Sequence, residues 1–167
     1  MSPDRGLSIR PLARADAEVL APLLATMDPW ARLGLPPASL LSFLGGEARP
    51  GVSRWCLESD GAVAGAIVLI EAWLLGPYVQ HLSVLPAYQG SGLGSAAMAW
   101  IEARARQRGD RNLWVCASSF NGRALAFYAH HGFVRVGVLE GLLRQGLDEI
   151  LLRKPLAVAP EAPPRSA

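Results

Sequence analysis

Residues 89–100 read Gln-Gly-Ser-Gly-Leu-Gly-Ser-Ala-Ala-Met-Ala-Trp, a glycine-rich loop that runs directly into an Ala-rich segment of helical composition. Loops of this kind present backbone N–H groups to a phosphate at the N-terminus of a helix. The Lys-Ser or Lys-Thr pair of a P-loop is absent. A dinucleotide fingerprint does match at Gly92-Leu93-Gly94-Ser95-Ala96-Ala97, but it belongs to a first βα turn, and here roughly half the chain comes first. The loop alone predicts a phosphate site without identifying its ligand.

The sequence on both sides of the loop narrows the choice. Residues 82–94 read L-S-V-L-P-A-Y-Q-G-S-G-L-G, and residues 121–133 read N-G-R-A-L-A-F-Y-A-H-H-G-F. In this order and spacing they resemble motif A and the N-x-x-A-x-x-F-Y-x-x-x-G-F signature of the GNAT superfamily of N-acetyltransferases. The likeness extends over residues 7–156. Within the superfamily, the sequence most resembles relatives of the ribosomal-protein N-terminal alanine acetyltransferase. The resemblance implies an acetyl-CoA-dependent enzyme with an amine acceptor.

Composition and charge favour one globular domain. The chain has 167 residues, of which 51% are hydrophobic and 18% are charged, with a formal net charge of +2. No dense basic block with interleaved aromatic residues suggests nucleic-acid binding. The two cysteines, Cys56 and Cys116, lie in strand-like apolar runs and are expected to be buried free thiols, with no metal site. We expect one domain over residues 1–156 and a disordered Pro/Ala-rich tail over 157–167.

One apolar segment needs a separate explanation. Residues 61–79 contain a single charge, at Glu71, and approach the length of about 20 residues that spans a bilayer. The segment begins at one turn signal, Asp60-Gly61, and is interrupted by another, Gly76-Pro77. These signals favour two buried strands instead of a membrane span. The first residues do not resemble a signal peptide. We therefore expect a cytoplasmic protein without a membrane partner.

The pattern of apolar residues predicts a mixed α/β sheet protein. Its order is β-α-α-β-β-β-α-β-α-β-β, with Asp16 able to cap the first helix and Pro22 expected to kink it or shift its start. The resemblance implies a GNAT-like acyl-CoA N-acyltransferase fold of about seven strands flanked by four helices. Strands are expected at 7–10, 53–58, 62–70, 78–85, 113–117, 133–139 and 149–153, and helices at 16–27, 37–44, 93–108 and 121–131.

The resemblance also implies which residues hold acetyl-CoA. The pyrophosphate would lie on backbone amides of the loop, at Gln89, Gly90, Ser91, Gly92, Leu93 and Gly94. Pantetheine would pair with the backbone of Leu82 and Val84, Asn121 would bond to the pantetheine arm or only cap its helix, and Arg123 would reach a phosphate. Many relatives carry Arg or Lys where this chain has Gly90 and Ser91. The loop would then depend mainly on backbone dipoles.

Tyr128 matches the family's tyrosine that faces the CoA sulfur and protonates the departing thiolate. A free tyrosine has a pKa of about 10 and a thiol about 8.5, so complete transfer is uphill by roughly 2 kcal/mol. For the base that accepts the amine proton, the candidates are Glu71, His81 and a water relay. Tyr78 and Gln80 lie with His81 on or near the strand expected at 78–85, where the resemblance implies that the base is often placed. Glu71 is a lone acid in an apolar run, where burial would raise its pKa.

The acceptor would lie between residues 27–35 and residues 140–148, as the resemblance implies. Trp30 and Arg32 could line the pocket, although Trp30 fits ordinary packing equally well. Neither region carries the dense acidic cluster that a polyamine or aminoglycoside would need. A non-catalytic acyl-CoA-binding or regulatory module and a nucleotide-binding oxidoreductase remain as alternatives. The sequence is compatible with a monomer or a homodimer.

Overall fold

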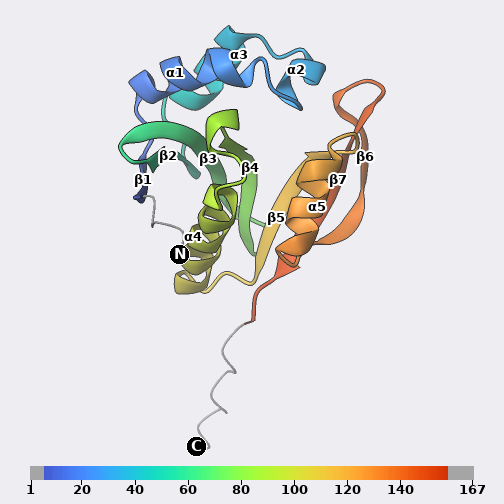
Figure 1. Cartoon of the computed structure of the whole chain (residues 1–167). Coiled ribbons are helices and arrows are strands. Elements are labelled where there is room, and N and C mark those ends of the chain that lie inside the picture. The colour runs from blue at the N-terminus through green and yellow to red at the C-terminus, as the bar shows by residue number, and fades with distance from the viewer. Residues whose placement is uncertain (1–5, 158–167) are drawn as a thin grey trace, which may run out of the picture.

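The computed structural model describes residues 6–157, and every structural statement below concerns that range. Seven strands form one sheet in the order β1-β2-β3-β4-β5-β7-β6 (Figure 1). The strands are β1 (Leu7–Pro11), β2 (Val52–Ser59), β3 (Ala62–Trp73), β4 (Gly76–Val84), β5 (Asn112–Ser118), β6 (Val134–Arg144) and β7 (Leu147–Pro155). The helices are α1 (Arg14–Leu24), α2 (Trp30–Leu33), α3 (Pro37–Gly45), α4 (Leu93–Gln107) and α5 (Gly122–His130), with a single 3₁₀ turn at Pro86–Tyr88.

The junction between β4 and β5 is the feature that positions the site. All other neighbouring strands are antiparallel, but β4 and β5 run parallel because the helix α4 connects them as a crossover. Their pairing is confined to Tyr78 opposite Trp114 and Val79 opposite Val115. Beyond these pairs the strands separate towards the end that α1–α3 cover, as Figure 1 shows. Residues 80–84 of β4 therefore have no partner on β5, and an extended ligand has room beside them.

Two hydrophobic cores hold the helices on opposite faces of the sheet. On one face, α4 and α5 pack through residues such as Met98, Ile101 and Tyr128 against Ile67 and Val115. On the other face, α1 and α3 pack through residues that include Leu20, Leu24, Leu40 and Leu44 against Ala66 and Val68 of β3. The alternation of Ala66, Ile67 and Val68 between the two cores follows from the two-residue period of a strand.

The mixed-sheet fold class is confirmed, and the elements follow the predicted order with one additional helix; three local expectations are wrong. Residues 6–157 contain five α-helices instead of four, because residues 30–33, expected to be a break, form α2. The cap of α1 is Ala13, and Asp16 lies three residues further on, where its carboxylate accepts from the Ala13 N–H at 2.8 Å. Pro22 lies inside the helix near its end.

The third difference concerns residues 140–148, which were expected to form a loop. Most of them lie in β6 and β7, which are joined by a tight turn in which Gly146 adopts a φ of 82°. The strands β6 and β7 thus form one long hairpin at the edge of the sheet. The predicted tail lies outside the described residues apart from residue 157.

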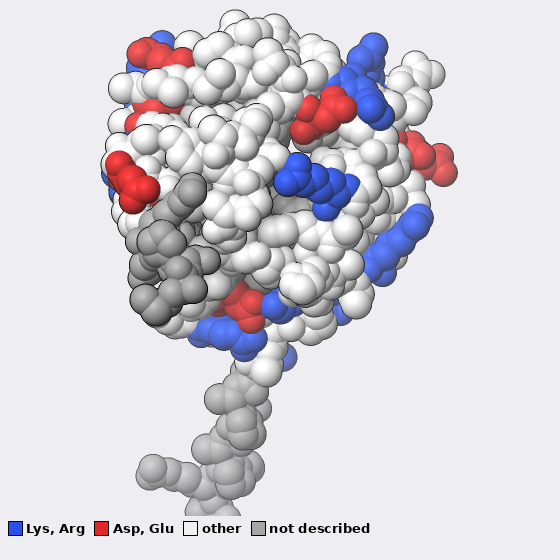
Figure 2. All heavy atoms as spheres, in the orientation of Figure 1, with Lys and Arg blue, Asp and Glu red and all other residues white. Residues whose placement is uncertain are grey.

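The hydrophobic stretch at 61–79 forms β3 and the start of β4, as expected, with its turn at Leu74 and Leu75 rather than at Gly76-Pro77. Within residues 6–157, no helix is long and apolar enough to cross a membrane. Charged side chains are scattered over the face shown in Figure 2 and do not gather into one patch.

Candidate functional site

A cavity of about 790 Å³ opens where β4 and β5 separate. It extends to both faces of the sheet. One part of the cavity lies next to α5 and the loop at 88–95, and we call it the α4–α5 half. The other part lies next to α2 and α3, and we call it the α1–α3 half. The residues Leu82 and Val84, predicted to pair with a cosubstrate, line the cavity on the unpaired stretch of β4. The geometry thus brings the two predicted ligand regions into one continuous space.

The loop before α4 offers a row of free backbone donors in the α4–α5 half. Within residues 6–157, no acceptor pairs with any N–H group of residues 90–95. Gly90 and Gly92 have φ values of 74° and 87°, in the left-handed region that glycine adopts without strain. Free N–H groups at the start of a fifteen-residue helix form a site for an anion.

Gln89 differs from the prediction for this loop. Its backbone N–H donates to the Pro86 carbonyl at 3.3 Å and so is not one of the free donors. Its side chain instead links two elements, because Nε2 donates to the Val84 carbonyl at 2.8 Å and Oε1 accepts from Arg123 Nη1 at 2.7 Å. Gln89 therefore fixes the loop against β4 and α5.

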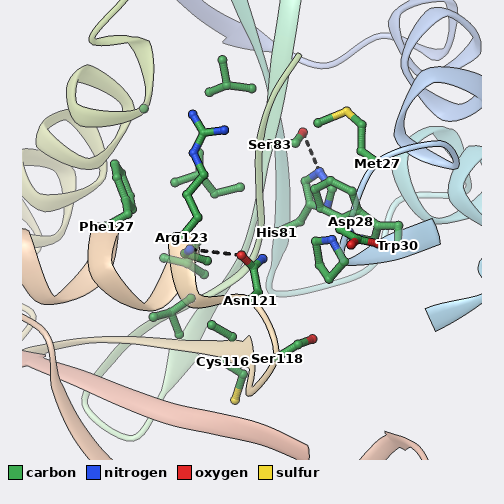
Figure 3. Close-up of a pocket in the computed structure, with 18 of the residues that line it drawn as sticks. Met27, Asp28, Trp30, His81, Ser83, Cys116, Ser118, Asn121, Arg123 and Phe127 are labelled. Atoms are coloured by element: carbon green, nitrogen blue, oxygen red, sulfur yellow. Dashed lines mark hydrogen bonds between the residues drawn. The ribbon is translucent and has the colours of Figure 1, made fainter. Parts of the chain in front are cut away.

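The first turn of α5 faces this loop across the cavity. Asn121 caps the helix by accepting from the Ala124 N–H at 3.1 Å (Figure 3). Asn121 also lines the cavity, so a capping role and a ligand role are compatible. The exposed guanidinium of Arg123 is held next to the loop by Gln89. Arg123 thus adds the positive charge that the loop's own side chains lack.

Tyr128 lies on α5 with 7% of its surface exposed and lines the same cavity. Its ring packs edge-on against Phe127 and Phe133, with centroid distances of 5.3 and 5.4 Å. Among the described residues, its hydroxyl has no hydrogen-bonding partner. Burial raises the pKa of Tyr128 well above its ordinary value, so the phenol stays protonated at neutral pH. The hydroxyl is a donor available to a ligand.

His81 lies in the α1–α3 half, on β4. Its ring packs against Trp30 at 4.8 Å and against Phe43 at 5.8 Å, and Nε2 is 2.8 Å from Ser83 Oγ (Figure 3). Burial lowers the pKa of His81 to about 4. The imidazole is therefore neutral near pH 7, with a lone pair able to accept a proton. Trp30 both packs and lines the cavity, so its two expected roles coincide.

Glu71, the first candidate for the base, is not brought to this cavity. Its carboxylate accepts from Arg104 Nη2 at 2.8 Å, from Arg108 and from the Ser53 hydroxyl. Burial by itself raises the pKa of Glu71, but the Ser53 hydrogen bond and the two guanidinium groups outweigh it, and the pKa is lowered. The expectation of a raised pKa is wrong. Glu71 has no charged neighbour in the sequence, but in the fold it pairs with Arg104 of α4 and Arg108 of the turn that follows.

The regions expected to enclose an acceptor contribute unequally. Residues from the segment 27–35 line the α1–α3 half, whereas the segment 140–148 contributes Leu143. Arg32 points elsewhere: it pairs with Asp28 at 3.2 Å and lies over the Phe120 ring at 4.4 Å. The Arg32 carbonyl accepts from Arg144 Nη1 at 3.1 Å, so α2 and the hairpin are joined beside the cavity.

Tyr78, one of the residues named near the expected position of the base, lines the cavity. Cys116, Ser118 and Glu149 also line it and were not proposed as catalytic or ligand-binding from the sequence. Cys116 was expected to be an ordinary buried thiol, but it is half-buried and faces the cavity. Glu149 is 4% exposed and accepts from Ser118 Oγ at 2.5 Å. The pairing of β5 with β7 places Ser118 opposite Glu149, and this register was not evident from the sequence. In the described part of the chain, no cluster of three or more His, Cys, Asp or Glu could hold a metal ion.

Comparison with known proteins identifies the class. The family model described as "Acetyltransferase (GNAT) family" matches residues 20–133, and the chain belongs to this family. The chain is 34% identical over 89 residues to a streptothricin acetyltransferase of Streptomyces lavendulae, which covers 53% of this chain and 47% of that protein. The chain thus spans about half the length of several of the curated relatives that it matches.

Solved structures confirm the fold. The ribosomal-protein-S18-alanine N-acetyltransferase of Escherichia coli superimposes with a TM-score of 0.73 at 20% identity, covering 93% of this chain and 97% of that one. A streptothricin acetyltransferase structure from Bacillus anthracis, in complex with acetyl coenzyme A, gives a TM-score of 0.59 at 21% identity over 65% of each chain. The predicted family and fold are therefore correct, and the oxidoreductase alternative is not supported.

Proposed function

We propose that this chain is an acetyl-CoA-dependent N-acetyltransferase that moves an acetyl group to a primary amine, on a small molecule or a peptide N-terminus, by direct attack in a ternary complex. One observation carries the proposal. A single cavity joins the free N–H groups before α4, the Tyr128 hydroxyl and the aromatic α1–α3 half. A cosubstrate and an acceptor could thus enter from opposite faces of the sheet and meet where β4 and β5 separate.

The residues of the α4–α5 half fit the cosubstrate. The free amides of residues 90–95 would bind the pyrophosphate, assisted by the positive end of α4 and by Arg123. The unpaired backbone of Leu82 and Val84 would bind pantetheine as an added strand. The Asn121 side chain would contact the same arm. Acetyl-CoA would supply the activated acetyl thioester.

Tyr128 and His81 would manage the protons. The Tyr128 hydroxyl would donate a hydrogen bond to the sulfur as negative charge develops there, which requires no complete early proton transfer. His81 would accept the proton that the amine loses, and Ser83 and water would pass it on. Its pKa of about 4 makes the neutral ring a weak proton acceptor, so a relay to solvent fits better than storage on the ring.

We also propose that the protein is cytoplasmic, because both cysteines are free thiols and reduced cysteines persist in that compartment. Residues 1–156 would form one domain, and the protein would be a monomer or a homodimer. Light scattering after size-exclusion chromatography would distinguish a monomer from a homodimer.

Calorimetry with acetyl-CoA and CoA-release assays over a broad amine panel test the activity. The expected result is tight cosubstrate binding together with amine-dependent CoA release. Binding without turnover on any amine would identify a non-catalytic acyl-CoA-binding module instead. The absence of acetyl-CoA binding would refute the proposal altogether.

A further inference from the structure

Glu149 is the buried carboxylate of the cavity, and the proposed function assigns it no role. It lies on β7 with 4% of its surface exposed and faces the same space as His81 and Tyr78. One carboxylate oxygen accepts from the Ser118 hydroxyl at 2.5 Å. Within the described residues, the second oxygen has no hydrogen-bonding partner. Since Glu149 lines the cavity, that oxygen is available to a bound molecule.

The charge of Glu149 has no protein counterion. Among residues 6–157, no Lys, Arg or His forms a salt bridge with it. Its polar neighbours Tyr78, Cys116 and Ser118 are neutral groups, and burial raises its pKa. An isolated carboxylate in an apolar setting is unfavourable unless a cation pairs with it. A cationic ligand group would supply the missing partner.

The surroundings restrict what else the ligand carries. Among the residues that the structure describes, Asp28 is the only acid besides Glu149 that lines the cavity, and Asp28 is exposed and paired with Arg32 at 3.2 Å. A polycation would therefore bring charges that no free carboxylate here could balance. The α1–α3 half also has an apolar and aromatic wall, beside the uncharged polar side chains of His81 and Ser83; the residues of this wall include Met27, Trp30, Leu33, Leu35, Phe43 and Leu143.

We infer that the acceptor is a primary amine with one positive charge and an apolar or aromatic body, and that Glu149 binds its ammonium group. This inference rests on the proposed acetyl transfer for the identity of the acceptor. The carboxylate and the Ser118 hydroxyl orient the ammonium group, and Trp30 and Phe43, whose rings pack against His81, contact the apolar body. The ammonium group loses its proton after binding, before it attacks.

The test compares three probes with matched shapes or charges, measured by calorimetry on protein saturated with CoA. The probes are 2-phenylethylamine, its uncharged counterpart 2-phenylethanol, and the polycation spermidine. The variant Glu149→Gln keeps the size of the side chain and its bond to Ser118. The control Glu140→Gln removes a carboxylate that is exposed on β6. CoA affinity of each variant serves as the check that the fold is retained.

We expect wild-type protein to bind 2-phenylethylamine at least about tenfold more tightly than 2-phenylethanol, since a charge-assisted hydrogen bond in a buried site gives that ratio. Glu149→Gln should abolish the ratio and Glu140→Gln should preserve it, and spermidine should bind more weakly than 2-phenylethylamine. An unchanged ratio in Glu149→Gln, tighter binding of spermidine, or no binding of 2-phenylethylamine would overturn the inference.

These outcomes separate the inference from the proposed function, because binding is measured without turnover. Glu149-dependent binding of 2-phenylethylamine, with no CoA release on any amine of the panel, would contradict the activity alone. Acetylation of 2-phenylethylamine with full binding in Glu149→Gln would contradict the role of Glu149 alone.

Discussion

Replacing Tyr128 by phenylalanine tests the central chemical step. The Tyr128 ring is fixed by Phe127 and Phe133, whereas its hydroxyl has no protein partner in the described part of the chain. Phenylalanine therefore keeps the packing and leaves no buried donor or acceptor unpaired. We expect the melting temperature of Tyr128→Phe to stay within about 2 °C of wild type, so that any loss of rate reports on chemistry.

The size of the expected loss follows from the state of the phenol. Complete transfer of its proton to a thiolate is uphill by roughly 2 kcal/mol for free groups, and burial raises the pKa of Tyr128 further. The hydroxyl should then act by a hydrogen bond to developing charge, which contributes about 1.5–3 kcal/mol. Removing it should lower kcat about 10- to 150-fold. The lost factor should be constant with pH up to about 9, because the phenol remains protonated throughout.

The assay is CoA release under saturating acetyl-CoA and amine, with chromatographic quantification of CoA. Tyr78→Phe is the matched control, because Tyr78 is another tyrosine that lines the cavity but is half-buried on β4, where it packs against Trp73 at 5.3 Å. It should lose less than about threefold in kcat. Full activity of Tyr128→Phe would refute the assigned acid, and an equal loss in both variants would show a general effect on the cavity.

Three further predictions concern residues around the site. Glu71→Gln should leave kcat unchanged but lower the free energy of unfolding by about 1–3 kcal/mol in denaturant titrations, because Arg104 and Arg108 lose a partly buried partner; a large loss of kcat would restore Glu71 as the base. Arg123→Gln should raise KM for acetyl-CoA about 5- to 20-fold with little change in kcat, in steady-state kinetics; an unchanged KM would place this arginine outside the phosphate site. Because the folded pKa of His81 is about 4 and the unfolded value is 6.5, His81 contributes stability above pH 6.5 that is lost as pH falls towards 4. Chemical denaturation should show that, between pH 6.5 and pH 4, the free energy of unfolding falls by about 3 kcal/mol less in His81→Asn than in wild type. Identical pH profiles of the two proteins would contradict the lowered pKa.

Sequence reasoning worked best where one local signal decides the structure. The loop at 89–94 and the helix that follows Asn121 are short-range features, set by glycine conformation and by a side-chain cap. The alternation of apolar residues likewise located the central strands. These features predicted the fold and several of the residues that line the α4–α5 half of the cavity.

Features that depend on long-range pairing were not accessible in the same way. The acid Glu71 looks isolated in the sequence, yet Arg104 and Arg108 reach it from α4 and its end, more than thirty positions away. Glu149 looks like one of several scattered acids, and only the register of β7 against β5 buries it beside Ser118. Burial and counterions together decide a pKa, so reasoning from neighbours in the chain predicted the wrong direction for the pKa of Glu71.

The position of Cys116 bears on whether the acetyl group passes first to the protein. Cys116 is the thiol that lines the cavity, so it is the natural candidate for a covalent acetyl carrier. Burial raises the pKa of this thiol and the nearby Glu149 adds to the effect, which outweighs the opposing contribution of Tyr78. A thiol is nucleophilic as its thiolate, and that form is scarce here at neutral pH. In the proposed reaction, by contrast, the amine would meet the neutral imidazole of His81, which can accept its proton. The same apolar enclosure that makes Cys116 a poor nucleophile therefore favours direct attack by the amine.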